Sequence, residues 1–334
     1  MSITAKELAE KLGLSAAAVS MALNNKPGVS ESTRDRVLKA AREYDFDFGR
    51  QRIREEADKG SIALLMYRRH GAVVGDTLFF SALSEGISNA CRAAGYRMNL
   101  QYLHEENLRV ELCNLLSSDT KGILLVGTEM RGGDFAPFVS LPLPLVVLDS
   151  YFEGIPRDCV LINNVQGAFT ATNYLIAKRG KQPGYLRSSY PINNFDERAD
   201  GFYKAIRYNG MSTSASIVHR LAPSVEGAYA DMKVLLAQSE PLASCYFADN
   251  DLIAAGAMRA FKEAGYRIPE DIGIVGFDNS AACEMLDPPL TTIHVPKQAL
   301  GQIAVERLTA IMARKPSANI KIEIETTLIK RKSM

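Results

Sequence analysis

The sequence predicts an α/β protein in which an N-terminal all-α helix-turn-helix headpiece precedes a two-lobed core of doubly wound parallel sheets. Two observations support this fold class. Residues before Phe48 carry only helical patterns, whereas from Ser61 onwards short apolar runs alternate with helical segments. Such alternation is typical of βαβ units, whose parallel strands are covered by helices on both faces. Because the alternation runs twice through segments of similar length, we expect two lobes with a cleft between them.

Length, composition and cysteine content indicate a globular protein of two or three domains. At 334 residues the chain is too long for one core, and 47% hydrophobic with 23% charged residues is ordinary. The net charge of +1 argues neither for nor against nucleic acid. The five cysteines are scattered without a C-x-x-C pair, so we expect no disulfide framework, metal or cofactor. With no membrane-spanning run and no signal segment, we expect a cytoplasmic protein without a membrane partner.

Three short helices are expected in residues 1–47. Thr4 and Glu7 form a capping box at the start of the first helix, and Gly13 ends it. Ser15 caps the second helix and Ser30 caps the third. Two short helices joined by a glycine-containing turn make a helix-turn-helix, whose second helix lies in the major groove of DNA.

The core elements alternate along the chain. In the first pass, strands are expected over residues 61–67, 96–103, 122–127 and 144–149, and helices over residues 79–95 and 107–117. In the second pass, helices are expected over residues 166–179, 197–209, 226–238 and 251–264, and strands over residues 184–186, 216–221, 244–248 and 272–278. Residues 322–333 are expected to form a strand and a charged tail.

Polar side chains stand at the ends of three predicted strands. Asp149, Asn250 and Asp278 each follow a buried apolar run. Ligands of open α/β sheets bind beyond the carboxyl ends of the strands, and carboxylates and amides pair with ligand hydroxyl groups. These residues are therefore candidates for a small-molecule site. The alternative is that they only cap the turns or helices that follow.

Two parts of the sequence resemble one family. The run "KLGLSAAAVSMALNNKPGVSESTRDRVLKAA" is similar to the headpiece of the lactose-repressor (LacI) family of bacterial transcription regulators. The stretches "FADNDLIAAGAMRAFKEAGYRIPEDIGIVGFDN", "DPPLTTIHVP" and "LIKRKS" resemble the type I periplasmic-binding-protein-like core of the same family. Three motifs agree in order and spacing, and the resemblance covers nearly the whole chain.

The resemblance implies a domain organisation. The headpiece comprises residues 1–47, a hinge or linker residues 48–60, and the effector-binding and dimerisation domain residues 61–334. Lobe 1 is expected to hold about residues 61–162 and 294–322, and lobe 2 about residues 163–293 and 323–334.

The resemblance also implies ligand contacts. Arg198 matches the family's ligand-binding arginine, and Phe80 matches an aromatic residue at the lip of the first lobe. Adjacent helical residues diverge by about 100°, so we expect Phe80 in the cleft and Phe79 in the core. Thr128 and Glu129 are weaker candidates. The predicted ligand set is Phe80, Asp149, Arg198, Asn250 and Asp278.

The same resemblance implies that DNA bases are contacted by Ala16, Ala17 and Met21. Some family members carry polar side chains at these positions. These residues can contact thymine methyl groups but cannot make bidentate hydrogen bonds to bases. Specificity must rest on apolar contacts, on DNA shape, or on three polar residues, which are Ser15, Ser20 and Asn24.

Phosphate contacts are expected from hydroxyl groups and helix N-termini at Thr4, Ser30 and Thr33. The predicted DNA-binding set is completed by Ala5, Lys6 and Arg50. The family's hinge inserts a leucine into the minor groove, but the matching position here is Glu55. A carboxylate cannot act as an apolar wedge, so we expect no leucine insertion.

These observations predict an effector-responsive transcriptional regulator, a repressor of carbohydrate or related catabolic genes. Its expected partners are double-stranded operator DNA, a small-molecule effector that is a sugar or sugar derivative, and a second copy in a homodimer. One alternative is a sugar-binding protein without a regulatory DNA role, which the N-terminal helices argue against. The other is an α/β enzyme, but the chain has no G-x-G-x-x-G, Walker A or G-x-S-x-G motif, and we expect no catalysis.

Overall fold

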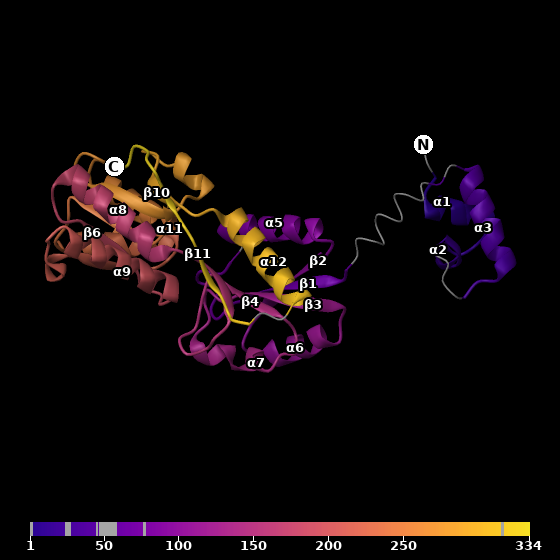
Figure 1. Cartoon of the computed structure of the whole chain (residues 1–334). Helices are drawn as coiled ribbons and strands as arrows, with labels where there is room; N and C mark the ends of the chain where they lie inside the picture. Colours follow the sequence, from indigo (N-terminus) through magenta and orange to yellow (C-terminus); the bar gives the residue numbers. More distant parts are fainter. Residues whose placement is uncertain (1–2, 24–27, 45, 47–58, 76–77, 315–316) are drawn as a thin grey trace. The chain divides into compact units, whose positions relative to one another are not determined.

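The computed structural model describes residues 3–23, 28–44, 46, 59–75, 78–314 and 317–334 (Figure 1). The chain divides into two compact units, Met1–Lys59 and Gly60–Met334. The first unit is helical and the second contains both sheets. The predicted fold class, a helical headpiece followed by a two-lobed α/β core, is confirmed.

Three helices form the described part of the first unit, α1 (Ala5–Leu12), α2 (Ala16–Leu23) and α3 (Glu31–Glu43). The predicted capping box is present, since Thr4 Oγ1 accepts from Glu7 N at 3.3 Å and the Glu7 carboxylate accepts from Thr4 N at 2.8 Å. Gly13 ends α1 with φ at 60°, a left-handed conformation that glycine adopts without strain. The small core of the unit contains residues from all three helices, among them Leu8, Val19, Ala22, Val37 and Ala41.

Lobe 1 is built on a parallel six-stranded sheet. Its strand order is β11-β5-β4-β3-β1-β2. The strands are β1 (Ser61–Tyr67), β2 (Arg97–Leu103), β3 (Thr120–Val126), β4 (Leu145–Leu148), β5 (Asp158–Ile162) and β11 (Lys321–Ile324). The apolar residues of β1 are buried along its whole length, because helices cover both faces of the sheet.

Helices cover the two faces of this sheet separately. On one face lie α5 (Leu78–Ala93) and α12 (Lys297–Ala313), whose buried residues share a core with Leu64 and Leu124. On the other face lie α6 (Leu108–Leu116) and α7 (Ala136–Val139), which pack on Leu65 and Leu125 (Figure 1). Alternate residues of one strand therefore enter different cores, as the doubly wound arrangement requires.

The helix α12 was not among the elements expected from the sequence. It packs against α5 through glycines. A Cβ on Gly301 would lie 2.8 Å from Ile87 Cγ1, and a Cβ on Gly86 would lie 2.4 Å from the Gln298 carbonyl oxygen. The close approach of the two backbones explains why small residues interrupt the apolar pattern of both helices.

Lobe 2 is built on a second six-stranded sheet of order β12-β10-β9-β8-β6-β7, in which only β12 is antiparallel to its neighbour. The strands are β6 (Gly184–Ser188), β7 (Val218–Leu221), β8 (Cys245–Ala248), β9 (Gly273–Asp278), β10 (Thr291–His294) and β12 (Thr327–Ile329). The longer helices are α8 (Asn164–Arg179), α9 (Asn193–Tyr208), α10 (Val225–Ala237) and α11 (Asp251–Glu263). Short 3₁₀ helices of lobe 2 are η2 (Thr213–Ala215) and η3 (Ala281–Glu284), and η1 (Gly132–Phe135) is a short 3₁₀ helix of lobe 1.

The chain passes between the lobes three times. It leaves lobe 1 after β5, returns after β10 to form α12, and leaves again between Ile324 and Thr327. The final segment therefore holds two short strands, one in each sheet, where one strand and a tail were expected.

The start of α9 also differs from the prediction, because the helix begins at Asn193 rather than four residues later. Among the described helices, none has the length and apolarity needed to cross a lipid bilayer.

Candidate functional site

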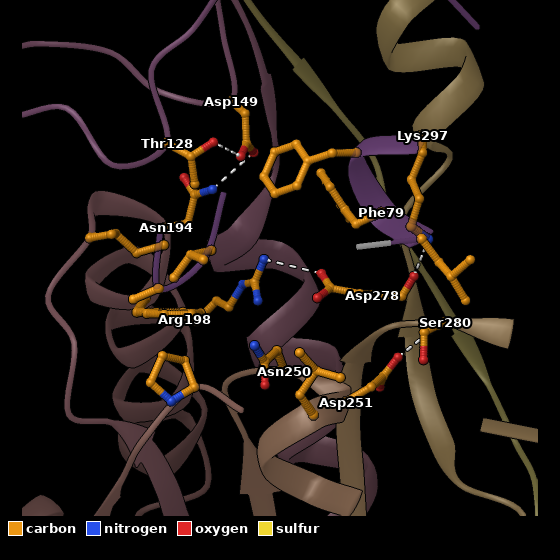
Figure 2. Close-up of a pocket in the computed structure, with 18 of the residues that line it drawn as sticks. Phe79, Thr128, Asp149, Asn194, Arg198, Asn250, Asp251, Asp278, Ser280 and Lys297 are labelled. Carbon is orange, nitrogen blue, oxygen red and sulfur yellow. Dashed lines mark hydrogen bonds and ion pairs between the residues drawn. The ribbon is translucent and has the colours of Figure 1, made fainter. Parts of the chain in front are cut away.

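A cavity of about 300 Å³ lies between the two lobes (Figure 2). Its lining comes from loops and helix starts at the carboxyl ends of strands in both sheets, where the topology places ligands. All five residues of the predicted ligand set line it, namely Phe80, Asp149, Arg198, Asn250 and Asp278. The fold thus brings together side chains that are up to 198 positions apart in the sequence.

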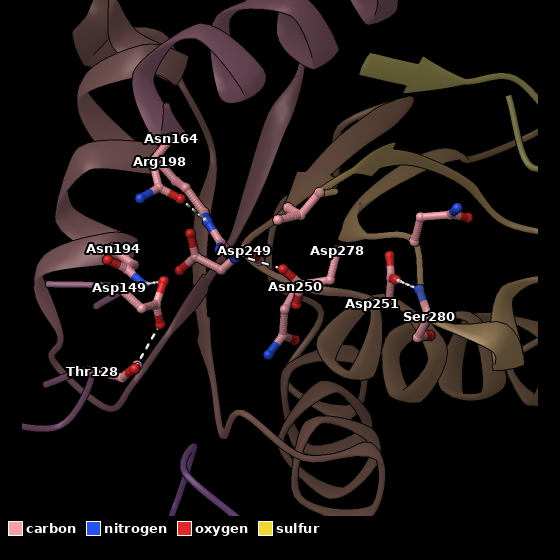
Figure 3. A network of polar contacts seen from close by, with 12 residues as sticks. Thr128, Asp149, Asn164, Asn194, Arg198, Asp249, Asn250, Asp251, Asp278 and Ser280 are labelled. Carbon is pink, nitrogen blue, oxygen red and sulfur yellow. Dashed lines mark hydrogen bonds and ion pairs between the residues drawn. The ribbon is translucent and has the colours of Figure 1, made fainter. Parts of the chain in front are cut away.

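Asp149 follows β4 and is 2% exposed. Thr128 Oγ1 donates to its Oδ2 at 2.6 Å, and Asn194 Nδ2 in α9 donates to its Oδ1 at 2.9 Å (Figure 3). Burial raises the pKa of Asp149 to about 6, although the two hydrogen bonds and the charge of Arg198 oppose the shift. Asp149 caps no helix, and its φ of 57° is a strained value for a non-glycine residue, as is common at binding sites.

Arg198 lies on α9, one turn after Asn194, and its side chain is 3% exposed. Nε donates to Asn164 Oδ1 at 2.9 Å, and Nη1 donates to the carbonyl oxygen of Asp249. Nη2 lies 3.4 Å from Asp278 Oδ1, and the guanidinium carbon lies 3.8 Å from the centroid of the Phe277 ring. These contacts hold the guanidinium plane in one orientation at the cavity wall.

Asp278 ends β9 and is the most accessible carboxylate of the cavity, with a side chain 20% exposed. Its backbone carbonyl accepts a hydrogen bond from Lys297 Nζ, at the start of α12. Burial raises the pKa of Asp278, and the charges of Arg198 and Lys297 oppose the shift. Burial lowers the pKa of Lys297, with the charge of Asp278 acting against it. The φ of Asp278 is 104°, so this strand end is also strained.

Asp251 and Asn250 hold the start of α11. Asn250 Oδ1 caps the helix by accepting from Ile253 N at 2.9 Å, so the capping alternative applies to this residue, which also lines the cavity. Asp251 accepts from Thr292 Oγ1 at 2.5 Å and from Ser280 N at 2.7 Å. Burial raises the pKa of Asp251 to about 6.

The apolar part of the cavity wall includes both phenylalanines at the start of α5. Phe80 is 4% exposed and belongs to the core as well as to the cavity lining. Phe79 packs against the core as expected, but its half-buried ring also lines the cavity, 5.6 Å from Lys297 Nζ, so the expectation that only Phe80 faces the cavity is wrong (Figure 2). Both rings reach the cavity because Phe79 and Phe80 lie in the first turn of α5 and the N-terminal end of this helix faces the cavity.

Glu129, a weaker candidate for a ligand contact, binds a loop of the protein instead. Its carboxylate accepts five main-chain N–H groups at 2.6 to 3.1 Å, from residues 69, 70, 71, 73 and 74. Burial alone would raise the pKa of Glu129, but the hydrogen bonds outweigh burial and lower it. Glu129 therefore acts as the anchor of a loop, and that loop brings Ala72 and Val73 to the cavity wall.

Sequence reasoning missed several polar residues of the lining, among them Asn194, Ser280 and Lys297. Asn194 lies four residues before Arg198, a helical spacing that places both on one face of α9 and could have identified it. Lys297 stands in no motif, and only the packing of α12 brings it to the strand ends of lobe 2. Within the described residues, no group of His, Cys, Asp and Glu could hold a metal ion.

The predicted DNA-contacting residues are spread over the three helices of the first unit. Ala16, Ala17 and Ser20 are exposed on α2, and Met21 is half-buried. Lys6 is exposed and Ala5 half-buried on α1. Thr4, Ser15 and Ser30 each accept a main-chain N–H near a helix start, and Thr33 Oγ1 lies 2.8 Å from Ser30 Oγ. The predicted contacts of Asn24 and Arg50 lie outside the described residues.

Comparison with known proteins agrees with both units. The model of bacterial regulatory proteins of the lacI family matches residues 4–47, and the periplasmic binding protein-like domain matches residues 172–334. The HTH-type transcriptional repressor PurR of Pasteurella multocida is 30% identical over 338 residues, which cover 99% of this chain and 98% of that protein.

Solved structures with the same fold include two regulators that hold a ligand. The lac repressor dimer bound to operator and the anti-inducer ONPF matches with a TM-score of 0.75 at 23% identity, covering 100% of this chain and 99% of the other. A LacI family transcriptional regulator from Enterococcus faecium with bound ribose matches with a TM-score of 0.69 at 26% identity, covering 81% of this chain and 98% of the other.

A helix-turn-helix joined to a two-lobed core with a polar interlobe cavity is the architecture of a ligand-controlled DNA-binding protein. The chain belongs to the lacI family of bacterial regulatory proteins and is a DNA-binding transcriptional regulator. The predicted family and regulatory function are confirmed. Its relatives are transcriptional regulators rather than enzymes.

Proposed function

We propose that the interlobe cavity binds a small, uncharged, polyhydroxylated effector, a sugar or sugar derivative, and that its occupancy sets the operator affinity of a homodimeric repressor of carbohydrate or related catabolic genes. One observation carries this proposal. Carboxylate, amide and guanidinium groups from both lobes converge on one cavity that also has an aromatic wall. Sugars need this combination, because their hydroxyl groups form hydrogen bonds and their ring faces pack on apolar surfaces.

The charges of the lining favour an uncharged effector over a phosphorylated one. Three carboxylates line the cavity, from Asp149, Asp251 and Asp278, against the two cations Arg198 and Lys297. Both cations already bond to the protein, Arg198 to three acceptors and Lys297 to two carbonyl oxygens. A phosphate would enter a cavity whose carboxylates repel it and whose cations are engaged. The ribose in the Enterococcus faecium regulator is an uncharged ligand of the proposed kind.

The regulatory step in this proposal is a change in lobe closure. Residues of both lobes line the cavity, so an effector that contacts both is bound more tightly by the closed state and shifts the population toward it. In a homodimer, closure changes the distance between two headpieces, and half-site spacing sets how well both engage a pseudo-palindromic operator. The lac repressor, which shares the fold, is a dimer on its operator.

Thermal unfolding of the full-length protein tests the effector site. We would measure the melting temperature with pentoses, hexoses, their phosphates and nucleosides, each at about 10 mM. An effector present at 100 times its Kd stabilises the native state by about 2.7 kcal/mol, on the order of 5 °C for a core of this size.

Two substitutions in the cavity test whether a rise in melting temperature comes from binding there. The shift should disappear in Asp278→Ala and Arg198→Ala and persist in Glu240→Ala, an exposed residue of lobe 2. The same compound should change the affinity for operator DNA. Stabilisation by sugar phosphates only, or stabilisation that survives both cavity substitutions, would contradict the proposal.

A further inference from the structure

The exposed face of α2 is unusual for a helix that meets DNA. None of its eight residues, AAAVSMAL, is charged. Val19 and Ala22 are buried in the core of the first unit. Ala16, Ala17 and Ser20 are exposed, so the surface that α2 presents consists of two methyl groups and a hydroxyl, with the half-buried Met21 beside them.

Among the described residues, the polar groups near this face are the hydroxyls of Ser15 and Ser20, which carry little base information. Ser15 Oγ accepts from Ala18 N at 3.1 Å, so one of its two acceptor lone pairs is used in capping α2. A serine hydroxyl such as that of Ser20 can donate to or accept from either member of a base pair, which gives weak discrimination. A side chain that could bind guanine or adenine in a bidentate manner, such as Arg or Gln, is absent from the whole of α2.

Met21 is held in place by the backbone of Gly28. Gly28 has a φ of 114°, and a Cβ built on it would lie only 2.9 Å from Met21 Sδ. The backbone therefore packs directly on the thioether. A restrained methionine loses less conformational entropy on binding than a free one, which makes it a better apolar contact.

We propose that α2 reads operator DNA through thymine C5-methyl groups, which Ala16, Ala17 and Met21 contact in the major groove. The inference rests on the proposed function in one respect, namely that α2 is the element that enters the groove. The thymine methyl is the only apolar group that a base pair presents there, and methyl-bearing side chains are its complement. The operator half-site is accordingly expected to hold thymines where these residues lie.

The size of the effect follows from the area of one methyl group. Removing one buried methyl from the interface should weaken binding by about fourfold. That loss is small for each base but adds over two half-sites, because contacts at separated positions are roughly additive.

The experiment begins with the full-length protein and selection of bound duplexes from a random library. Each thymine of the selected site is then replaced by deoxyuridine, which pairs identically but lacks the C5-methyl group. Dissociation constants are measured by fluorescence anisotropy at one fixed salt concentration, since phosphate contacts make all affinities salt-dependent. We expect a loss of about fourfold at one or more thymines of each half-site and no loss at thymines outside them.

A double-mutant cycle separates methyl contact from recognition of DNA shape. Ala16→Gly, Ala17→Gly and Met21→Ala each remove apolar atoms, and one of them should abolish the sensitivity to deoxyuridine at one position. Ala18→Gly is the matched control, because it changes the helix propensity of α2 equally, and the half-buried Ala18 is rotated by about 200° around the helix from Ala16. Circular dichroism of each variant confirms that the headpiece is folded.

Two results would overturn the inference. The first is a selected site in which no thymine is sensitive to deoxyuridine. The second is a sensitivity that none of the α2 substitutions alters, which indicates shape reading. If α2 does not enter the groove at all, the α2 substitutions will leave the affinity for every DNA sequence unchanged, which distinguishes this outcome from the two above.

Discussion

The side-chain amide of Asn194 donates a hydrogen bond to Asp149 Oδ1 at 2.9 Å, and this bond joins the two lobes. Asp149 follows a strand of the first sheet, whereas Asn194 lies in the first turn of α9, in lobe 2. Thr128 holds the other carboxylate oxygen from lobe 1. Asn193 adds a second link by donating to the Tyr151 carbonyl oxygen at 2.8 Å. Opening of the cleft must break these bonds, so α9 is coupled to the opening of the interlobe cavity.

Replacing Asn194 tests the link between the lobes. Asn194→Asp places a second carboxylate beside Asp149, and two adjacent carboxylates cannot both ionise without cost. We expect Asn194→Asp to lower the free energy of unfolding by on the order of 2 kcal/mol at pH 7, and more than Asn194→Ala does. At pH 5 the two carboxyl groups can share a proton, and most of the difference should disappear.

Urea unfolding of the full chain at both pH values measures this effect. Asn89→Asp serves as the control, since Asn89 is exposed in the interior of α5. Equal stability of Asn194→Asp and Asn194→Ala at pH 7 would show that the contact between the lobes is absent in solution.

Glu129 should stabilise the loop that walls the cavity. Glu129→Ala leaves five main-chain N–H groups without their acceptor, and water can satisfy only the more exposed of them. We expect a loss of about 3 kcal/mol or more in the free energy of unfolding. Hydrogen exchange of residues 69–74 should be faster in the variant. Glu153→Ala, at an exposed position of lobe 1, should change stability by less than about 0.5 kcal/mol. Unchanged exchange in Glu129→Ala would contradict the anchoring role.

The buried carboxyl groups predict a dependence of stability on pH. Burial raises the pKa of Asp249 to about 6, although Tyr185 and Ser188 donate to it. An aspartic acid with a higher pKa in the folded than in the unfolded state binds more protons when folded, so its contribution to stability improves as pH falls. Between pH 7 and pH 5 this amounts to about 1 kcal/mol for one such group.

Comparison with Asp249→Asn isolates this contribution. Burial lowers the pKa values of His219 and His294, and their effect on stability has the opposite sign in the same range of pH. The wild type should therefore gain about 1 kcal/mol relative to Asp249→Asn when the pH is lowered from 7 to 5. Calorimetry at pH 7, 6 and 5 provides the measurement. A difference that grows in the other direction would mean that the folded protein stabilises Asp249 as a carboxylate.

The ion pair between Arg307 and Asp158 fixes α12 to β5. Arg307 Nη2 lies 2.5 Å from Asp158 Oδ1, and the two side chains are 13% and 6% exposed. Asp158 also accepts from Ile320 N at 3.0 Å, which ties the segment before β11 to the same carboxylate. Arg307→Met would leave the buried carboxylate without its cation, and we expect a loss of about 3–5 kcal/mol in the free energy of unfolding.

The double substitution Asp158→Asn with Arg307→Met should recover much of this loss, because no charge is then buried. Lys233→Met removes a mostly exposed ion pair in lobe 2 and should change stability by less than about 1 kcal/mol. A loss below about 1 kcal/mol in Arg307→Met would indicate that water solvates the pair.

Much of the fold could be predicted from local patterns. Most strands of the core are short apolar runs, and the capping box at Thr4 identified the start of α1 within one residue. Two differences from the predicted elements, the early start of α9 and the helix α12, have a common cause. The interlobe hydrogen bonds of Asn193 and Asn194 accompany the early start of α9, and packing on α5 through Gly86 and Gly301 shapes α12. Neither contact can be predicted from a short stretch of sequence, because the residues that make it are far apart in the chain.

The lining of the interlobe cavity likewise contains residues that local patterns predict and residues that only distant contacts place there. Asp149, Asn250 and Asp278 could be predicted because they follow buried strands, and strand ends of a parallel sheet converge at one edge. Arg198 and Phe80 were assigned through family resemblance. The role of Glu129 could not be predicted, because the loop whose N–H groups it binds lies more than fifty positions earlier in the chain.

Interactions between neighbours in the chain and short motifs are enough to predict the family, the class of fold, the helix-turn-helix and the strand-end residues of the cavity. Which polar groups face one another depends on the packing of the whole chain. Lys297 reaches Asp278, Asn194 reaches Asp149, and Phe79 enters the cavity wall only through the relative placement of two lobes that the chain crosses three times. Such contacts depend on the packing of segments distant in sequence, which no local pattern encodes.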